Sequence, residues 1–153
     1  MKTLKPLFLL ATLFVLASTG CKKNGSTPST ITANVTFKFN GSSKKYTMVN
    51  AAYYKSVNPS SIQIIGSEGS QGLNLSITDP KIGTFNLLDN SVMATYSTSS
   101  DINNTYIGSS GKVVITSFTA ETIAGTFEFS GNNGLNQAGA ITEGSFSAKF
   151  ITE

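Results

Sequence analysis

The residue types that support most enzyme chemistry are absent from this sequence. It contains no histidine and a single cysteine, Cys21. Without an imidazole there is no Ser-His-Asp triad, no His-ligated zinc site and no histidine general base. One thiol also cannot form a disulfide within the chain or a multi-cysteine metal site. We therefore expect no cofactor and no metal, and the remaining question is what the thiol of Cys21 does.

Cys21 stands directly after a segment with the layout of a secretion signal. Two lysines precede a run from Leu7 to Ala17 that is apolar except for Thr12, and small residues follow it. A membrane-spanning helix needs roughly 20 residues, whereas the apolar part of a signal peptide needs about 7–15. We predict a signal peptide over residues 1–20 and a polar, flexible tether over residues 21–30.

The junction at Cys21 resembles a lipobox, the motif after which bacterial lipoprotein leaders are cut and the cysteine is diacylated. Ser18 stands where the usual motif has leucine, as in the looser boxes of the Bacteroidota. Two or more acyl chains hold a protein stably on a membrane, at about 0.8 kcal/mol per buried methylene. The resemblance implies a lipid anchor in the cell envelope, at the outer membrane. The absence of an acidic cluster after Cys21 favours the periplasmic face over the cell surface.

The charge of the chain excludes one large class of partners. All eleven basic residues are lysines, and two of them lie in the predicted leader, which leaves nine lysines against eight carboxylates. Nucleic-acid binding needs several phosphates neutralised together, and arginine supplies its bidentate contacts. We therefore expect no nucleic acid as a partner.

From Ile31 onward, apolar and polar residues alternate with a period of two, which is typical of half-buried strands. Strands follow one another at short intervals, separated by turn residues. We predict one all-β domain over residues 31–153, an antiparallel β-sandwich or flattened barrel of about nine strands. The expected inward residues are Ile31, Ala33, Val35, Phe37, Phe39, Ile62, Ile64, Leu73, Leu75, Ile77, Phe85, Leu87, Ile123, Gly125, Phe127, Phe129, Phe146, Ala148, Phe150, and either Val113 with Ile115 or Val114 with Phe118.

Turn residues divide these strands. Asn40-Gly41 is the strongest short hairpin signal, with a returning strand expected over Lys44–Val49. Further turns are expected at Ser109–Gly111 and at Glu143-Gly144. The Ser-x-x-Lys pattern of Ser42–Lys45 falls in the first hairpin, so we interpret it as hairpin sequence and not as a nucleophile motif.

The oxygen-rich segment from Asp101 to Asn104 lacks the spacing of a calcium loop, and we expect an Asx-turn there. The eight carboxylates are scattered mainly among the expected turns. A pair of them facing each other across a cleft would support glycoside hydrolysis. The sequence alone brings no two of them together.

Tyrosines remain as candidates for ligand binding, because an exposed ring can stack on a sugar or meet a protein partner. Tyr53 and Tyr54 are adjacent, so in a strand they point to opposite faces and one of them is partly solvent-exposed. The alternative for each ring is cross-strand aromatic packing. The candidates are Tyr53, Tyr54, Tyr96 and Tyr106, together with Tyr46.

Four short segments, two of which begin Gly-Thr-Phe, follow a Cys-Lys-Lys start and resemble a family of small Bacteroidota lipoproteins whose β-domain has no known function. The matching segments are Gly83–Leu87, Ser110–Thr116, Gly125–Phe129 and Thr142–Phe146. The resemblance implies an envelope β-domain and no catalytic residue. We expect a non-catalytic binding or structural module, with a glycan or an envelope protein as its partner. The alternatives are a carboxylate-dependent glycan hydrolase and an accessory or inhibitor subunit of an envelope complex.

Overall fold

The computed structural model describes residues 32–153, and the predicted leader and the whole predicted tether, with Cys21, lie outside this range. The all-β prediction is confirmed. The strands are β1 Asn34–Phe39, β2 Ser42–Tyr46, β3 Met48–Tyr54, β4 Ser61–Glu68, β5 Gln71–Thr78, β6 Gly83–Asn86, β7 Val92–Ser97, β8 Thr105–Phe118, β9 Thr122–Asn132, β10 Ala138–Lys149 and β11 Ile151–Thr152; two 3-10 turns are η1 Leu87–Asp89 and η2 Ile102–Asn104. Within residues 32–153, no helix has the length and apolar character needed to cross a membrane.

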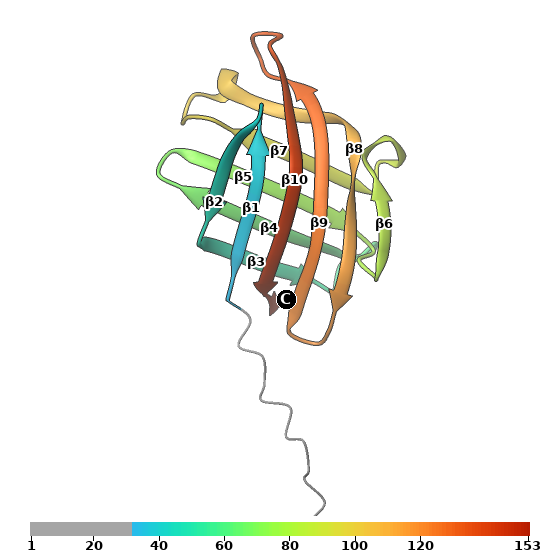
Figure 1. Ribbon diagram of the computed structural model, residues 1–153. Coiled ribbons are helices and arrows are strands. Elements are labelled where there is room, and N and C mark those ends of the chain that lie inside the picture. Colours follow the sequence, from blue (N-terminus) through green and yellow to red (C-terminus); the bar gives the residue numbers. More distant parts are fainter. Residues whose placement is uncertain (1–31) are drawn as a thin grey trace, which may run out of the picture.

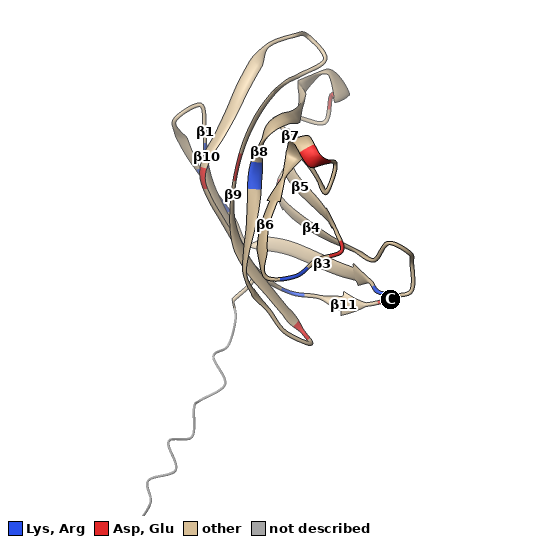
Figure 2. Cartoon of the chain, turned by 90° about the vertical axis from the view of Figure 1, so that its right-hand side faces the viewer, with Lys and Arg blue, Asp and Glu red and all other residues tan. Residues whose placement is uncertain are grey.

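The strands form one sheet in the order β11-β3-β4-β5-β7-β8-β9-β10-β1-β2, with β6 paired to β8. Every pairing is antiparallel except that of β11 with β3. The first residues of β8 pair with β7, and the rest of β8 pairs with β9 and β6. The sheet therefore curls over at β8 into a half-barrel whose two layers cross each other (Figures 1 and 2).

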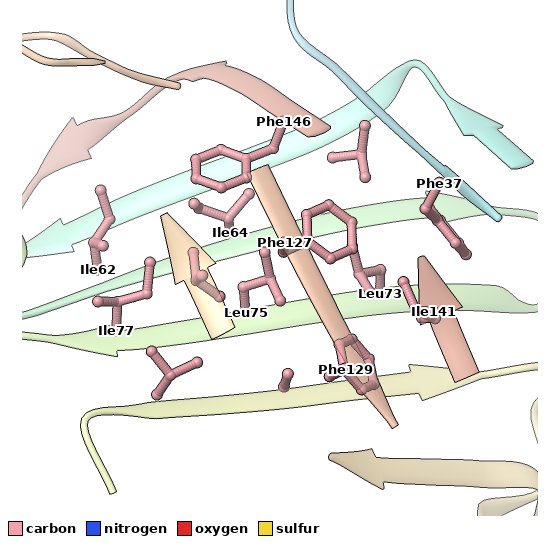
Figure 3. Packing of buried hydrophobic residues seen from close by; sticks show 14 of the residues in the cluster. Phe37, Ile62, Ile64, Leu73, Leu75, Ile77, Phe127, Phe129, Ile141 and Phe146 are labelled. Carbon is pink, nitrogen blue, oxygen red and sulfur yellow. The ribbon is translucent and has the colours of Figure 1, made fainter. Parts of the chain in front are cut away.

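The core lies between the two layers, and the alternation of the sequence accounts for it. The strands β4, β5, β9 and β10 each turn every second side chain inward, where the side chains are shielded from water (Figure 3). The expected inward residues in the described range are buried, except Ala33 and Phe39, which are half-buried. Phe39 packs against the core, and Ile31 lies outside the described residues. On β8 the inward pair is Val113 with Ile115, which settles the alternative that the sequence leaves open.

The predicted hairpin at Asn40-Gly41 is confirmed. Residues of β1 and β2 pair from Phe39 with Ser42 to Val35 with Tyr46. Asn40 has φ 47° and Gly41 has φ 82°, which are the left-handed conformations that a two-residue hairpin turn requires at both positions.

Three expected local features differ in the structure. Ser109–Gly111 is no turn, because β8 continues through it with a shift of register between Gly108 and Ser110. Glu143-Gly144 is likewise a bulge inside β10, where Glu143 has φ 51°. The strand expected over Lys44–Val49 breaks after Tyr46 and divides between β2 and β3.

The end of the chain joins the two layers. β10 belongs to one layer, and after Phe150 the chain enters the other layer as β11, which runs beside β3 (Figure 2). Backbone hydrogen bonds fix the crossing: Phe150 N donates to Glu121 O at 3.0 Å, and Glu153 N donates to Tyr53 O at 2.9 Å. This parallel pairing places residues 149–151 against the middle of β3.

Candidate functional site

Three of the five tyrosines lie inside the core. Tyr46 and Tyr96 have no exposed surface, and Tyr106 is 9% exposed. Their rings pack edge-on or tilted against Phe37 and Phe39, with centroid distances of 4.7–5.4 Å. Tyr96 and Tyr106 therefore present no ring face to a surface ligand, and cross-strand aromatic packing describes their role.

Burial affects the acidity of two of these phenols. It raises the pKa of Tyr46, and the neighbouring Tyr96 hydroxyl and the charge of Glu68 raise it further. Burial is also the main cause of the raised pKa of Tyr96. Both hydroxyls donate to Oε1 of Gln71, so the neutral phenols are hydrogen-bonded where they lie.

Tyr53 and Tyr54 point to opposite faces of β3, as their adjacency predicts. The Tyr53 ring packs inward, with centroids 5.5 Å from Phe118 and 5.7 Å from Phe150. Tyr54 is half-buried and lines a surface depression on the outer side of the sheet. Of the tyrosines that the sequence singles out, Tyr54 is the one that lines a surface hollow.

The depression beside Tyr54, which we call the Tyr54 groove, has a volume of about 420 Å³. The register of the strands explains the shape of the groove, because Ile151, Ala52 and Gln63 lie opposite one another across β11, β3 and β4. The small side chain of Ala52 leaves space in the middle of this row. The lining residues are Val49, Asn50, Ala51, Ala52, Tyr54, Gln63, Ile65, Lys149 and Ile151.

The groove combines an apolar floor with a few polar groups, as small-molecule sites do. Asn50 and Gln63 supply amides that both donate and accept hydrogen bonds. Lys149 supplies the one charge among the lining residues. In the described part of the chain the two ion pairs are Lys38–Glu143 and Lys112–Glu128, so Lys149 belongs to neither.

A second hollow, of about 280 Å³, lies on the outer side of β8, β9 and β10. Glu128 and Glu143 both line it, so the fold brings together two carboxylates that are distant in sequence. Each is paired with a lysine, at 2.8 Å for Lys38–Glu143 and 3.3 Å for Lys112–Glu128. The side chains of Glu128 and Glu143 are 53% and 67% exposed, whereas a general acid at neutral pH holds its proton through burial.

The remaining sequence motifs have local structural roles. Asp101 begins η2, and its Oδ1 accepts from the backbone of Asn103 at 2.9 Å, which is the expected Asx-turn. Ser42–Lys45 lies in β2 at the end of the sheet order. Among residues 32–153, no three His, Cys, Asp or Glu side chains gather closely enough to hold a metal ion.

A family model described as "Domain of unknown function (DUF6252)" matches residues 46–148. The chain belongs to this family. No curated protein and no solved structure matches this chain.

The DUF6252 match covers most of the Tyr54 groove and ends one residue before Lys149. Sequence reasoning identified Tyr54 but missed Asn50, Gln63 and Lys149. Asn50 and Gln63 could have been found from the sequence, because both stand at polar positions in the alternation of β3 and β4. No comparable signal existed for Lys149, because it reaches the groove through the parallel pairing of β11 with β3. Cys21, the predicted lipidation site, lies outside the described residues of this DUF6252 protein.

Proposed function

We propose that this protein is a lipid-anchored module of the bacterial outer membrane that binds a glycan in the Tyr54 groove and carries out no catalysis. The observation that carries the proposal is the groove itself. It presents a tyrosine ring, two amides and an aliphatic floor in one depression of about 420 Å³. Aromatic rings pack on the apolar faces of sugars, and amides exchange hydrogen bonds with hydroxyl groups.

The position of the groove on a sheet supports binding. Asn50, Ala52 and Tyr54 alternate along one strand, and their spacing is held by the seven residue pairs that join β3 to β4. A site built on strands holds its side chains more rigidly than a site on loops. A ligand therefore meets a largely formed surface, and little ordering is needed on binding.

The glycan-binding proposal is tested on a carbohydrate array with the full chain purified in detergent. Ala52→Leu fills the middle of the groove while leaving the inward face of β3 unchanged. We expect array binding by the wild-type chain and its loss in Ala52→Leu. The matched control is Ser76→Leu, which lies on β5 opposite Gln63 on the same face but does not line the groove. Absence of array binding, or equal binding by both leucine variants, contradicts the proposal.

The anchor is the second part of the proposal, and it rests on the leader and on Cys21. Mass spectrometry of the mature chain should find a diacylglyceryl modification on Cys21 as its first residue. Cys21→Ser should move the protein from the membrane fraction to the soluble fraction of the envelope. An unmodified thiol in the membrane-bound protein would overturn this part.

A glycan hydrolase is the second candidate, because Glu128 and Glu143 line one hollow. Two carboxylates can run glycoside hydrolysis as acid and base or nucleophile. Both carboxylates are ion-paired with lysine and more than half exposed, which favours a structural role for them. The test is release of reducing ends from the glycans that the array identifies. Turnover that Glu128→Gln or Glu143→Gln abolishes would establish the hydrolase in place of the non-catalytic module.

An accessory subunit is the third candidate, since the outer side of the layer that contains β7 carries exposed apolar residues. Met93 is 54% exposed and Ile107 is 61% exposed. Asn74 and Thr95 lie between Ile65 and Ile107 across the strands, and Met93 pairs with Ser76. The surface is therefore mixed and not continuously apolar. Co-purification of a stable partner that Met93→Asp releases would support this candidate over the glycan binder.

A further inference from the structure

We infer that the ligand of the Tyr54 groove is an acidic sugar, whose carboxylate pairs with Lys149 while its ring lies against Tyr54. This inference rests on the proposed glycan-binding function and narrows the class of ligand. It starts from the charge of the groove. The nine lining residues include one cation and no carboxylate.

Lys149 takes part in neither of the ion pairs found among residues 32–153. In the described range, the paired lysines are Lys38 and Lys112, both on the layer formed by β1, β8, β9 and β10. Lys149 is exposed and stands at the end of β10, where the chain crosses to β11. An ammonium group at the edge of a partly apolar depression attracts an anion more strongly than one in open solvent.

The arrangement of polar groups fits a carboxylated ring better than a simple anion. Asn50 and Gln63 lie on neighbouring strands and are not directly opposite, since Asn50 pairs with Ile65 and Ala52 pairs with Gln63. The two amides therefore present separated hydrogen-bonding points, which suits the spread hydroxyls of a sugar. A small inorganic anion would be bound by Lys149 and an amide N–H at most, and would leave Tyr54 and the apolar floor without a partner.

The volume of the groove sets a limit on the ligand. A depression of about 420 Å³ lies within the range of roughly 300–1,000 Å³ of small-molecule sites. It accommodates one or two sugar rings. We therefore expect recognition of a short segment of an acidic polysaccharide such as a uronate oligomer.

The test measures binding of trigalacturonate and of neutral maltotriose to the full chain in detergent, by titration calorimetry at low and high salt. We expect trigalacturonate to bind at least about tenfold more tightly than maltotriose, with weakening as salt screens the ammonium. Lys149→Met should remove this preference, and Lys149→Arg should restore most of it. Tyr54→Ala should weaken both sugars, because the ring serves the neutral part of the ligand.

The matched control for Lys149 is Lys112→Met, which removes one lysine from the other layer and leaves the groove intact. It should bind trigalacturonate as the wild-type chain does. Equal affinity for the two sugars, insensitivity to Lys149→Met, or no binding of trigalacturonate overturns the inference. In each of these cases the proposed function still stands if the array shows neutral glycans whose binding Ala52→Leu abolishes.

Discussion

Tyr46 and Tyr96 share one acceptor: their hydroxyls lie 3.3 and 3.4 Å from Oε1 of Gln71. The two phenols come from strands β2 and β7, on opposite layers of the curled sheet, and Phe37 packs edge-on against both rings. Two buried hydroxyls are thus hydrogen-bonded to one half-buried amide. The arrangement ties the layers together only while both phenols keep their protons.

The first prediction follows from the acidity of these phenols. Burial raises the pKa of Tyr46 and of Tyr96 above the ordinary value of 10.0, so the folded state holds their protons at a pH where the unfolded chain releases them. Their contribution to stability is therefore fully present below pH 10.0 and declines as the pH rises above it. Urea unfolding between about pH 8 and about pH 12, roughly two units either side of this value, measures the decline. The double variant Tyr46→Phe/Tyr96→Phe should show a shallower decline, and an unchanged slope would contradict the prediction.

The second prediction concerns Phe37, which sits at the centre of the aromatic part of the core. Its ring centroid lies 5.4, 5.3 and 6.1 Å from those of Tyr46, Tyr96 and Phe127. Phe37→Ala removes a side chain that is 2% exposed, and we expect it to lower the free energy of unfolding by about 3–5 kcal/mol. Chemical denaturation provides the measurement.

The control for Phe37 is Met93→Ala, because Met93 is 54% exposed on the outer side of the sheet. We expect this variant to change stability by no more than about 0.5 kcal/mol. Similar losses in the two variants would mean that the aromatic cluster does not contribute as its packing implies.

The third prediction concerns Asn133, the one polar residue that is buried among residues 32–153. Its Oδ1 accepts from the backbone of Leu135 at 3.0 Å and of Gln137 at 2.9 Å. Its Nδ2 donates to Oε1 of Gln137 at 3.0 Å, so this side chain makes three hydrogen bonds within the loop between β9 and β10, beside the backbone bonds there. Asn133→Ala removes three part-buried hydrogen bonds, and we expect a loss of about 1–3 kcal/mol.

Hydrogen exchange locates the Asn133 effect, since it should accelerate at Leu135 and Gln137 before the rest of the sheet. Asn132→Ala is the control, because Asn132 is exposed and its backbone pairing with Ala138 does not depend on the side chain. Uniform acceleration over the whole domain in Asn133→Ala would contradict a local role.

The parts of the fold that the sequence predicts are those in which local and long-range requirements agree. Ile62 and Ile64 alternate with polar residues, and each faces the core because β4 has one buried side. Asn40-Gly41 forms its hairpin because both residues accept positive φ where the turn requires it. In these places a short stretch of sequence already contains the physical reason for the structure.

Pairings between distant segments could not be predicted in this way. Lys149 reaches the Tyr54 groove only because the chain after Phe150 runs parallel to β3. Glu128 and Glu143 share a hollow because a bulge in β10 shifts its register against β9. Neither relationship leaves a periodic signal, so the candidate sites became visible only with the topology.

The segment Ser109–Gly111 shows why turn residues mislead inside long strands. Small residues are typical of turns, but β8 needs them where it passes close to β9. Gly111 has φ +126°, and a Cβ atom there would collide with the carbonyl oxygen of Glu128 on β9. Its glycine therefore serves close approach of two backbones and not a reversal of the chain.

The last prediction tests this role of Gly111. Gly111→Ala adds both an unfavourable backbone conformation and a collision with main-chain atoms that have little freedom to move. We expect a loss of at least about 3 kcal/mol in the free energy of unfolding. Gly69→Ala is the matched control, since Gly69 also has positive φ, at 58°, but has no atoms within 4 Å of an added Cβ. It should lose only about 1–2 kcal/mol, from the backbone conformation alone. Equal losses in the two variants would show that β8 and β9 can separate at this point, and that contact with Glu128 does not limit the residue at position 111.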